Sequence, residues 1–345
     1  MADLLGTALP VIQAPMAGVQ GSALAIAVCE AGGLGSLPCA MLSPQAMRAE
    51  LAAIRSATTR PYSVNFFCHT MPAPSATREA GWRAALAPYH REFGIDGAAI
   101  VAGPGRAAFD AAAADVIEAF RPPVVSFHFG LPAPELLQRV RGWGAKVLAS
   151  ATTVDEARWL EARGVDAVIA QGLEAGGHRG HFLDDDLTRQ SGLFALLPQI
   201  VAAVRVPVIA AGGIADAAGV AAARSLGAAG VQAGTAYLLC PEATTSAPHR
   251  AALKASAAPH TALTNLFTGR PARGIVNRLI RELGPISAAA PAFPLATAAI
   301  APLRAAAEQR GSSDFSPLWS GQRAPGFDDR PAADVTRALA AGWAA

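Results

Sequence analysis

Short apolar segments alternate with longer alanine-rich segments along most of the chain. The apolar segments have the length of buried strands, and the segments between them have the length and the end signals of helices. Strands that alternate with helices in this way form parallel sheets. Eight strands are expected, at residues 11–14, 34–37, 62–67, 124–129, 146–150, 167–170, 207–211 and 230–233.

Eight repeated βα units predict an α/β fold in which the sheet closes into a (β/α)8 TIM barrel. In such barrels the active site lies on the loops at the carboxyl ends of the strands. A doubly wound open sheet is the structural alternative, but the first βα turn carries no G-x-G-x-x-G motif. The closed barrel is therefore the favoured architecture.

Capping residues mark the beginnings of several barrel helices. Pro44 stands at a first helical turn, Thr153 opens a capping box with Glu156, and Asp216 caps a helix that runs to residue 226. Other helices are expected at residues 22–31, 45–56, 134–143, 191–204 and, closing the barrel, 335–343.

Two segments do not fit the eightfold pattern. One runs from about residue 70 to 120, with helices expected near 79–91 and 106–119, and the other from about residue 256 to 326. Both leave the barrel at carboxyl ends of strands, and loops of this length usually carry structure or function. We expect a smaller second domain, a lid or substrate domain of residues 71–119 and 256–326. The barrel then comprises residues 1–70, 120–255 and 327–345.

The composition excludes several classes of function. Of the 345 residues, 52% are hydrophobic and 16% are charged, and the net charge is only +2. Neither nucleic acid nor an anionic membrane is therefore an expected partner. No apolar run is long enough to span a bilayer, and the N-terminus lacks the basic region of a signal peptide. We expect a cytoplasmic enzyme, either a monomer or a homodimer.

The cysteine and histidine patterns do not indicate a metal site. No C-x-x-C, H-x-x-x-H or HExxH motif occurs in the chain. The glycines around His178 also argue against a helix that would bring it together with His181. Buried free thiols are expected for the four cysteines, Cys29, Cys39, Cys68 and Cys240.

The stretch QGLEAGGHRG, residues 171–180, places a histidine on glycines after the sixth strand. The imidazole of His178 titrates near neutral pH. Gly176 and Gly177 allow positive φ angles and the close approach of a ligand. His178 is therefore a candidate acid, base or electrophile.

Three polar residues near the strand ends have a structural interpretation. Arg179 is expected to anchor its loop, and Glu174 to pair with a main-chain amide or a basic residue. His69, which follows the third strand, is expected on an exposed loop.

Two glycine loops, after the seventh and eighth strands, predict a phosphate site. The segments AAGGIAD and GVQAGTAYLL contain Gly212, Gly213 and Gly234, whose main-chain N–H groups can turn onto an anion. Thr235 adds a hydroxyl donor. Glycine pairs also form plain tight turns, but TIM barrels often bind phosphate on these two loops.

Groups at other strand ends indicate a flat heterocycle beside the phosphate. Asn65 and Gln171 carry amides that both donate and accept hydrogen bonds, and the loop after the first strand offers the apolar Met16. An isoalloxazine ring presents an edge that such amides can recognise, and flavin mononucleotide (FMN) also brings the phosphate. FMN is therefore the expected cofactor.

Several motifs along the chain occur together in one family. They are QAPMAG, AGGLGS, NFF, SFHFG, QGLEAGGHRG, PVIAAGGIAD, GVQAGTAYLL, PEA and TNLFTGRPARG. In these motifs, and over nearly its whole length, the chain resembles the nitronate monooxygenases, the flavin family once called 2-nitropropane dioxygenases. SFHFG is a feature of the class I enzymes. One departure is Val19-Gln20, where many members continue with another glycine.

The resemblance implies a barrel with bound FMN, a smaller domain over the site, and a catalytic role for His178. It places His128, the histidine of SFHFG, on the substrate side. The resemblance implies contacts to the cofactor for part of the following set, and the remaining members are glycines of the predicted ligand-binding loops. Together they are Met16, Asn65, Gln171, Gly176, Gly177, Gly212, Gly213, Gln232, Ala233, Gly234 and Thr235.

The implied reaction converts an alkyl nitronate, such as propionate 3-nitronate, and O2 into a carbonyl compound and nitrite. With a neutral nitroalkane, His178 would remove the α-proton as a base. With a nitronate, a protonated His178 would bind the anion, and His128 would add a donor to the nitro oxygens.

Related flavin barrels share the EAGGH loop, so the alternative is an FMN-dependent NAD(P)H:quinone or enoyl-thioester reductase. A non-flavin aldolase or isomerase would need a lysine or a glutamate base at a strand end, and Lys146 stands at the wrong end of its strand. A binding role without catalysis is the interpretation least consistent with the glycine loops and the histidine.

Overall fold

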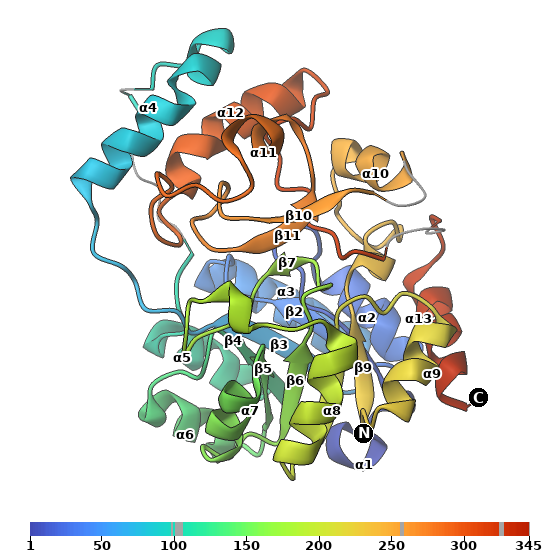
Figure 1. Ribbon diagram of the computed structural model, residues 1–345. Coiled ribbons are helices and arrows are strands. Elements are labelled where there is room, and N and C mark those ends of the chain that lie inside the picture. The colour runs from blue at the N-terminus through green and yellow to red at the C-terminus, as the bar shows by residue number, and fades with distance from the viewer. Residues whose placement is uncertain (98, 101–105, 256–258, 324–327, 345) are drawn as a thin grey trace.

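An eight-stranded parallel barrel forms the lower part of the molecule in Figure 1. The computed structural model describes all residues except 98, 101–105, 256–258, 324–327 and 345. Each barrel strand coincides with one of the eight predicted strands, so the predicted TIM-barrel fold is confirmed. In sheet order the strands are β1 (Val11–Gln13), β9 (Gly230–Ala233), β8 (Val208–Ala211), β6 (Ala167–Gln171), β5 (Lys146–Ala151), β4 (Val124–His128), β3 (Tyr62–Phe67) and β2 (Gly35–Pro38).

The ring of strands closes between β1 and the residues just before β2. Ile12 and Leu34 form a parallel bridge. The N–H of Leu34 donates to the carbonyl oxygen of Val11 at 2.9 Å, and the N–H of Gln13 donates to that of Leu34 at 3.0 Å. Closure brings the carboxyl ends of all eight strands to one rim of the barrel.

Helices surround the barrel where capping residues predicted them. Ser43 Oγ accepts from the N–H of Ala46 at 3.2 Å, and Thr153 Oγ1 accepts from that of Glu156 at 3.2 Å. The carboxylate of Glu156 accepts from Thr152 instead of completing the capping box. These helices are α2 (Ser22–Glu30), α3 (Pro44–Ala57), α6 (Pro134–Gly142), α7 (Val154–Glu161), α8 (Leu193–Ala203), α9 (Ala217–Ser225) and α13 (Ala332–Ala344). Shorter elements are α1 (Ala2–Leu5), η1 (Leu187–Arg189), η2 (Thr235–Tyr237) and α10 (Ala247–Lys254).

One helix of the first insertion packs with the barrel. This helix, α5 (Ala111–Phe120), contacts α3 and α6, and its Val116 and Ile117 are buried in the barrel's outer core. Residues up to 119 were predicted to belong to the lid, with this helix beginning near residue 106. The helix begins later because the carboxylate of Asp110 accepts from the N–H of Ala113 as its cap. We therefore propose a lid boundary that precedes α5.

A second hydrophobic cluster lies above the barrel rim and contains buried residues from both insertions. Within it, α4 (Ala76–Glu92) packs on α12 (Thr297–Gln309), and Nε1 of Trp82 donates to the carbonyl oxygen of Ala296 at 3.2 Å. Residues 98, 101–105, 256–258 and 324–326 of the predicted lid lie outside the described residues. The lid, as we call this part, contains α4 (Ala76–Glu92), β10 (Thr261–Thr264), β11 (Ala272–Ile275), α11 (Arg278–Leu283) and α12 (Thr297–Gln309).

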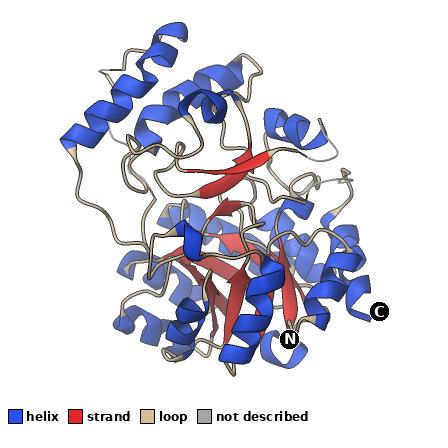
Figure 2. Ribbon diagram, viewed as in Figure 1, coloured by secondary structure: helices blue, strands red, loops and turns tan. Residues whose placement is uncertain are grey.

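His178 lies in a two-residue strand, β7 (Gly177–His178), which pairs with the lid and not with the barrel. Figure 2 shows this small sheet above the barrel. In the sheet β11 lies between β10 and β7, and Ala272 stands opposite His178 in an antiparallel register. The glycines and histidine predicted to follow the sixth strand are therefore bonded to the lid.

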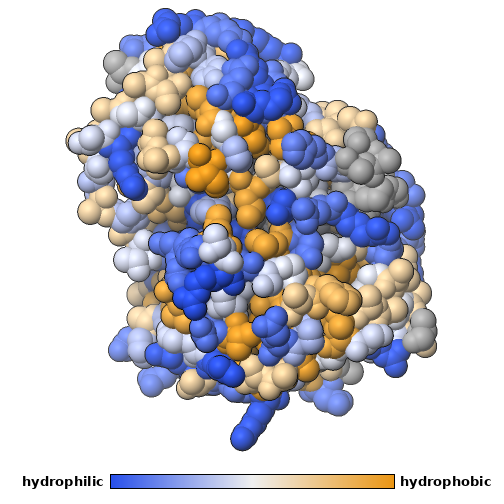
Figure 3. All heavy atoms as spheres, viewed as in Figure 1, coloured by the Kyte–Doolittle hydropathy of each residue, from blue (hydrophilic) through white to orange (hydrophobic). Residues whose placement is uncertain are grey.

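The face of the molecule in Figure 3 is least polar near the junction of its two parts. Hydrophobic residues form a band that runs from the lid toward the barrel, with hydrophilic residues on either side. In the part of the chain that the structure describes, no helix has both the length and the apolar character needed to cross a membrane.

Candidate active site

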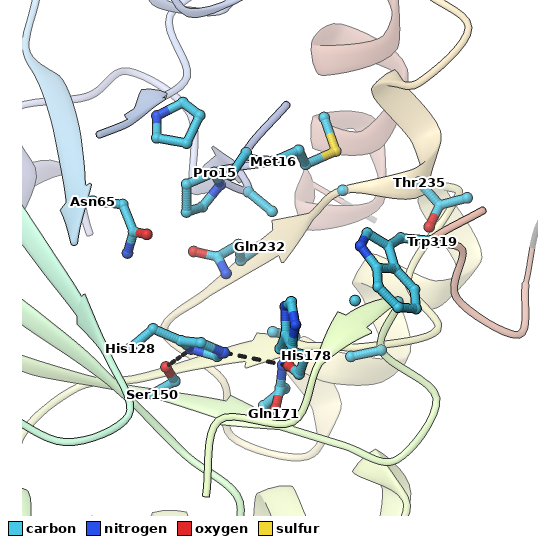
Figure 4. A pocket seen from close by; sticks show the side chains of 18 of the residues that line it. Pro15, Met16, Asn65, His128, Ser150, Gln171, His178, Gln232, Thr235 and Trp319 are labelled. Carbon is cyan, nitrogen blue, oxygen red and sulfur yellow. Dashed lines mark hydrogen bonds between the residues drawn. The ribbon is translucent and has the colours of Figure 1, made fainter. Parts of the chain in front are cut away.

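One pocket at the carboxyl rim of the barrel contains every residue predicted for the site (Figure 4). Loops of the barrel form most of it, and Trp319 and Gly321 reach it from the second insertion. The fold therefore brings the predicted residues together, while their individual roles stay predictions. These residues are Met16, Asn65, His128, Gln171, Gly176, Gly177, His178, Gly212, Gly213, Gln232, Ala233, Gly234 and Thr235.

Gln20 holds the loop that follows β1. Its Oε1 accepts from the N–H of Met16 at 2.9 Å, and its Nε2 donates to the carbonyl oxygen of Ser36 at 2.6 Å. A Cβ on Gly234 would lie 3.5 Å from the sulfur of Met16, so the β1 and β9 loops meet here. Gln20, part of the Val19-Gln20 departure from the glycine that many family members have, thus ties the Met16 loop to β2.

The loops after β8 and β9 form a glycine-rich cradle. Gly212 and Gly213 have φ angles of +120° and +68°, which favour glycine. A Cβ on Gly176 would lie 2.6 Å from the nitrogen of Gly321, so no side chain fits there. Thr235 Oγ1 accepts from the N–H of Gly321 at 2.9 Å, and no acceptor among the described residues takes its own hydroxyl proton. Main-chain and hydroxyl donors of this kind suit a phosphate.

The two predicted amides make different contacts. Asn65 Nδ2 donates to the carbonyl oxygen and the hydroxyl of Ser126, at 3.2 and 2.9 Å, so Oδ1 is the atom left to accept from a ligand. Gln171 donates from Nε2 to the carbonyl oxygen of His178 at 2.9 Å and accepts at Oε1 from the N–H of Gly180 at 2.8 Å. Gln171 therefore holds β7 in place and keeps one N–H for a ligand.

His178 is surrounded by aromatic rings where barrel and lid meet. Its ring centroid lies 5.3 Å from that of Phe293, 5.5 Å from that of Trp319 and 6.3 Å from that of Phe67. Burial holds the pKa of His178 well below its ordinary value of 6.5, and the positive charge of Arg106 lowers it further. The imidazole is therefore neutral at physiological pH and able to accept a proton.

His128 supports the main chain of His178 from the barrel (Figure 4). Its Nε2 lies 3.3 Å from the carbonyl oxygen of His178, and its Nδ1 lies 2.5 Å from the hydroxyl of Ser150. A carbonyl oxygen only accepts, so Nε2 carries the proton. The neutral ring then has only Nδ1 to accept, and the Ser150 hydroxyl donates to it in preference to the carbonyl oxygen of Phe127, 3.4 Å away. Burial lowers the pKa of His128 to about 3. Both ring nitrogens contact protein groups, and the predicted contact of His128 with substrate stays a prediction.

The charged side chains that line the pocket are arginines. Arg106 and Arg323 contribute, and neither aspartate nor glutamate lines the pocket within the described residues. Nη1 of Arg106 donates to Thr297 Oγ1 at 3.1 Å, and the guanidinium lies 5.9 Å from the ring centroid of Phe293. An arginine beside a cavity favours anionic ligands.

Three residues at the site come from the two insertions and were not predicted from the sequence. Arg106 and Trp319 line the pocket, and Thr268 contacts His178. The motif TNLFTGRPARG contains Thr268 and was the available signal for it. Nothing in the local pattern around Arg106 or Trp319 indicates that either faces the barrel.

The structural roles predicted for Arg179 and Glu174 are confirmed. Arg179 is completely buried and donates to the carbonyl oxygens of Gln171 and Gly172, at 2.8 and 2.6 Å. Glu174 accepts from the N–H of Leu193 at 2.8 Å. Both side chains therefore fix the shape of the segment that carries His178.

His69 was expected on an exposed loop, and this expectation was wrong. Its side chain is 8% exposed, and its ring centroid lies 4.8 Å from that of Phe293 in the second insertion. The insertion covers a position that the barrel alone would leave open to solvent.

The four cysteines form no disulfide, and they pack in the structure as small apolar side chains do. Cys29, Cys39 and Cys240 are buried and Cys68 is half-buried, and all four are free thiols. Within the described residues no group of three or more histidine, cysteine, aspartate or glutamate side chains could hold a metal ion.

The fold and the position of the pocket define the class of the protein as a TIM barrel with its candidate site at the carboxyl rim of the strands. A family model described as nitronate monooxygenase matches residues 1–340. The chain is 41% identical to the nitronate monooxygenase of Pseudomonas aeruginosa, over 97% of this chain and 96% of that protein. The chain therefore belongs to the nitronate monooxygenase family.

Solved structures agree with this assignment. The chain matches a nitroalkane oxidase from Streptomyces ansochromogenes with a TM-score of 0.89 and 41% identity, over 99% of this chain and 97% of the other. It matches FabK from Thermotoga maritima with a TM-score of 0.73 and 26% identity, over 99% and 95% of the two chains. The chain is thus more similar to the nitroalkane oxidase than to FabK. The family model, the relatives and the oxidase do not favour the reductase alternative.

Proposed function

We propose that this protein uses FMN and O2 to oxidise alkyl nitronates to a carbonyl compound and nitrite. The observation that carries the proposal is His178, a neutral half-buried imidazole in a pocket whose described lining contains arginines and no carboxylates. Such a pocket attracts small anions and can accept a proton from a neutral precursor. The similarity to nitronate monooxygenases and to a nitroalkane oxidase supports the same reaction.

The residues of the pocket fit FMN. Gly212, Gly213 and Thr235 would hold the phosphate through main-chain and hydroxyl donors. Met16 would contact the ring, and Asn65 Oδ1 would accept a hydrogen bond from it. FMN, when bound, supplies the electron transfer of the reaction. The remaining steps depend on side chains of the protein.

The task of His178 depends on the form of the substrate. A neutral nitroalkane must lose its α-proton, and the neutral imidazole accepts it. A nitronate has already lost that proton, and its negative charge is stabilised by positive groups. Arg106 and Arg270 are close enough to lower the pKa of His178 and would stabilise the anion as well. Since this environment disfavours protonated His178, we assign anion binding to the arginines.

Anaerobic reduction of the purified flavoprotein tests the proposed reaction against the reductase alternative. The flavin absorbance is followed after addition of a nitronate, NADH or NADPH in separate samples. We expect the nitronate to reduce the flavin and the nicotinamides to leave it oxidised. Rapid bleaching by NADH or NADPH, with no response to the nitronate, would overturn the proposal.

His178→Asn should lower turnover of neutral nitroalkanes by about 10²- to 10⁴-fold, which is the usual contribution of a general base. Flavin content should not change, because the imidazole is not among the groups that hold the phosphate. Steady-state oxygen consumption measures turnover, and absorbance measures bound flavin. His260→Asn, at an exposed position of the lid, is the control. Full activity of the His178 variant on neutral nitroalkanes would refute the assignment of the base.

A further inference from the structure

The lid holds the side chain of His178 through a contact that the proposed function does not explain. Nε2 of His178 lies 3.0 Å from Oγ1 of Thr268, in the segment between β10 and β11. Thr268 is only 1% exposed, so water does not compete for this hydrogen bond. His178 is thus bonded to the lid twice, through the β7–β11 pairing and through Thr268.

The other contacts of Thr268 determine which ring nitrogen of His178 carries the proton. The hydroxyl donates to the carbonyl oxygen of Arg270 at 3.3 Å and accepts from the N–H of Arg270 at 3.4 Å. A hydroxyl has one proton, which the carbonyl oxygen can only accept, whereas an imidazole nitrogen can either accept or donate. All three contacts of the Thr268 hydroxyl are therefore satisfied together only when the imidazole donates to it. Nε2 is protonated, and Nδ1 keeps the lone pair.

The remaining contacts leave Nδ1 as the free atom of the ring. Nδ1 has no hydrogen-bond partner within the described residues, and His178 lines the pocket. The carbonyl oxygen of His178 accepts from Gln171 at 2.9 Å and lies 3.3 Å from Nε2 of His128. Barrel residues and β11 thus fix the main chain of His178, and Thr268 of the lid fixes Nε2.

The turn that carries Thr268 is itself held against the barrel. Arg270 places its guanidinium 4.2 Å from the ring centroid of Phe129 and donates from Nε to the carbonyl oxygen of Arg179 at 3.3 Å. Gly269 has a φ angle of +89°, and a Cβ there would lie 2.0 Å from the carbonyl oxygen of Pro291. The position of the hydroxyl therefore depends on lid and barrel together.

We propose that Thr268 is a positioning residue that sets the tautomer of His178 and makes Nδ1 the proton-accepting atom. The inference rests on the proposed function, because it specifies the base for neutral nitroalkanes. Its consequence is that the base is correctly set only while the β10–β11 hairpin stays packed on the barrel.

Three variants test this role. Thr268→Val removes the hydroxyl and keeps the shape, and Thr268→Ser restores the hydroxyl. Thr264→Val is the matched control, because Thr264 is also 1% exposed in the lid, while its hydroxyl accepts from the main chain of Leu266. Nitrogen NMR of the histidine rings in the FMN-loaded enzyme reports the tautomer, and the His178→Asn spectrum assigns the signals.

We expect the wild type, Thr268→Ser and Thr264→Val to show the Nε2–H form of His178. Thr268→Val should show a mixture of tautomers or the Nδ1–H form. Its kcat for neutral nitroalkanes should fall roughly 10- to 100-fold with little change in KM. Turnover of a preformed nitronate should fall much less, because no proton is removed.

An unchanged tautomer in Thr268→Val would overturn the inference, and so would an Nδ1–H form in the wild type. Equal loss of kcat on neutral nitroalkane and nitronate would also overturn it, since that result indicates a general structural effect. If no form of the enzyme acts on nitro compounds, the proposed function fails. The ring-nitrogen spectra then still decide the role of Thr268.

Discussion

The chemistry of His178 depends on two kinds of neighbour, aromatic rings and arginines. Phe293 and Trp319 replace water around the imidazole, and desolvation is the largest cause of its low pKa. Arg106 is the next cause, because its charge repels an imidazolium. All three neighbours lie outside the barrel strands and their short loops. The insertions therefore supply the environment that makes a barrel histidine a base.

Arg106→Gln should raise the pKa of His178, because it removes a charge that lowers this pKa. A base loses activity as the pH falls through its pKa. The wild type should therefore keep its turnover of neutral nitroalkanes well below pH 6.5, and the variant should lose turnover at a higher pH than the wild type. Profiles of kcat/KM against pH measure the shift.

The control for this prediction is Arg48→Gln, on the exposed side of α3. It removes the same charge far from the pocket and should leave the profile unchanged. If the acid limb of the Arg106 variant coincides with that of the wild type, the charge of Arg106 does not act on His178.

The site residues that could be predicted are those at barrel strand ends. Asn65 and Gln171 follow from the βα period, because parallel strands of a closed barrel end at one rim. Arg106 and Thr268 could not be found in this way. Their segments have no regular period, and their positions depend on how the insertions fold back onto the rim.

At the scale of elements, close contacts between helices depend on glycines that leave no room for a side chain. A Cβ on Gly342 of α13 would lie 1.9 Å from the carbonyl oxygen of Ala217, at the start of α9. A Cβ on Gly81 of α4 would meet no atom within 4 Å. The two helical glycines therefore form a matched pair for substitution.

Gly342→Ala should lower the free energy of unfolding by about 1–3 kcal/mol, because the added methyl group overpacks the α9–α13 contact. Gly81→Ala should raise it by roughly 0.5–1 kcal/mol, because alanine is the better helix former. Chemical denaturation followed by circular dichroism measures both. A Gly342 variant as stable as the Gly81 variant would contradict the packing argument.

Predicted elements agree with the structure where the pattern is local. Every barrel strand was predicted, since each is a short apolar run between turn residues. β7 was not, because two residues are too few for a pattern and its partner β11 begins 94 residues later, at Ala272 against His178. Helix α5 begins at residue 111 because Asp110 caps it. The alanine-rich sequence before Asp110 hid this helix start from the sequence pattern.

At the scale of the whole molecule, the pocket lies between two separately packed parts. One hydrophobic cluster surrounds the barrel, and another joins α4 to the second insertion. The three-stranded sheet crosses between them, because β7 belongs to the barrel segment and β10 and β11 to the lid. Movement of the lid would therefore act directly on His178.

Stability should fall as the pH falls below 6.5, because His181 and His249 are buried as neutral rings, with exposures of 2% and 4%. Burial lowers their pKa values to about 3 and about 4, from an ordinary value of 6.5 in the unfolded chain. Between pH 6.5 and about 4 the unfolded state thus binds more protons than the native state. Each histidine lowers the free energy of unfolding by up to about 1.4 kcal/mol per pH unit.

Denaturation curves between pH 7 and pH 5 measure this dependence. His249→Gln removes one of the two titrating rings, so its stability should decline less steeply with falling pH than that of the wild type. Parallel pH dependences in the two proteins would contradict the assignment of a neutral buried ring to His249.

By itself the sequence determined the barrel, the glycine cradle and the family, because strands, helices and motifs are encoded by neighbouring residues. Only the tertiary structure decided what surrounds His178. Its strand partner, Thr268 and Arg106 come from segments remote in sequence, and they set its protonation through burial, charge and hydrogen bonding. The physical reason is that pKa and tautomer are properties of an environment, and this environment forms only when the insertions pack on the barrel rim.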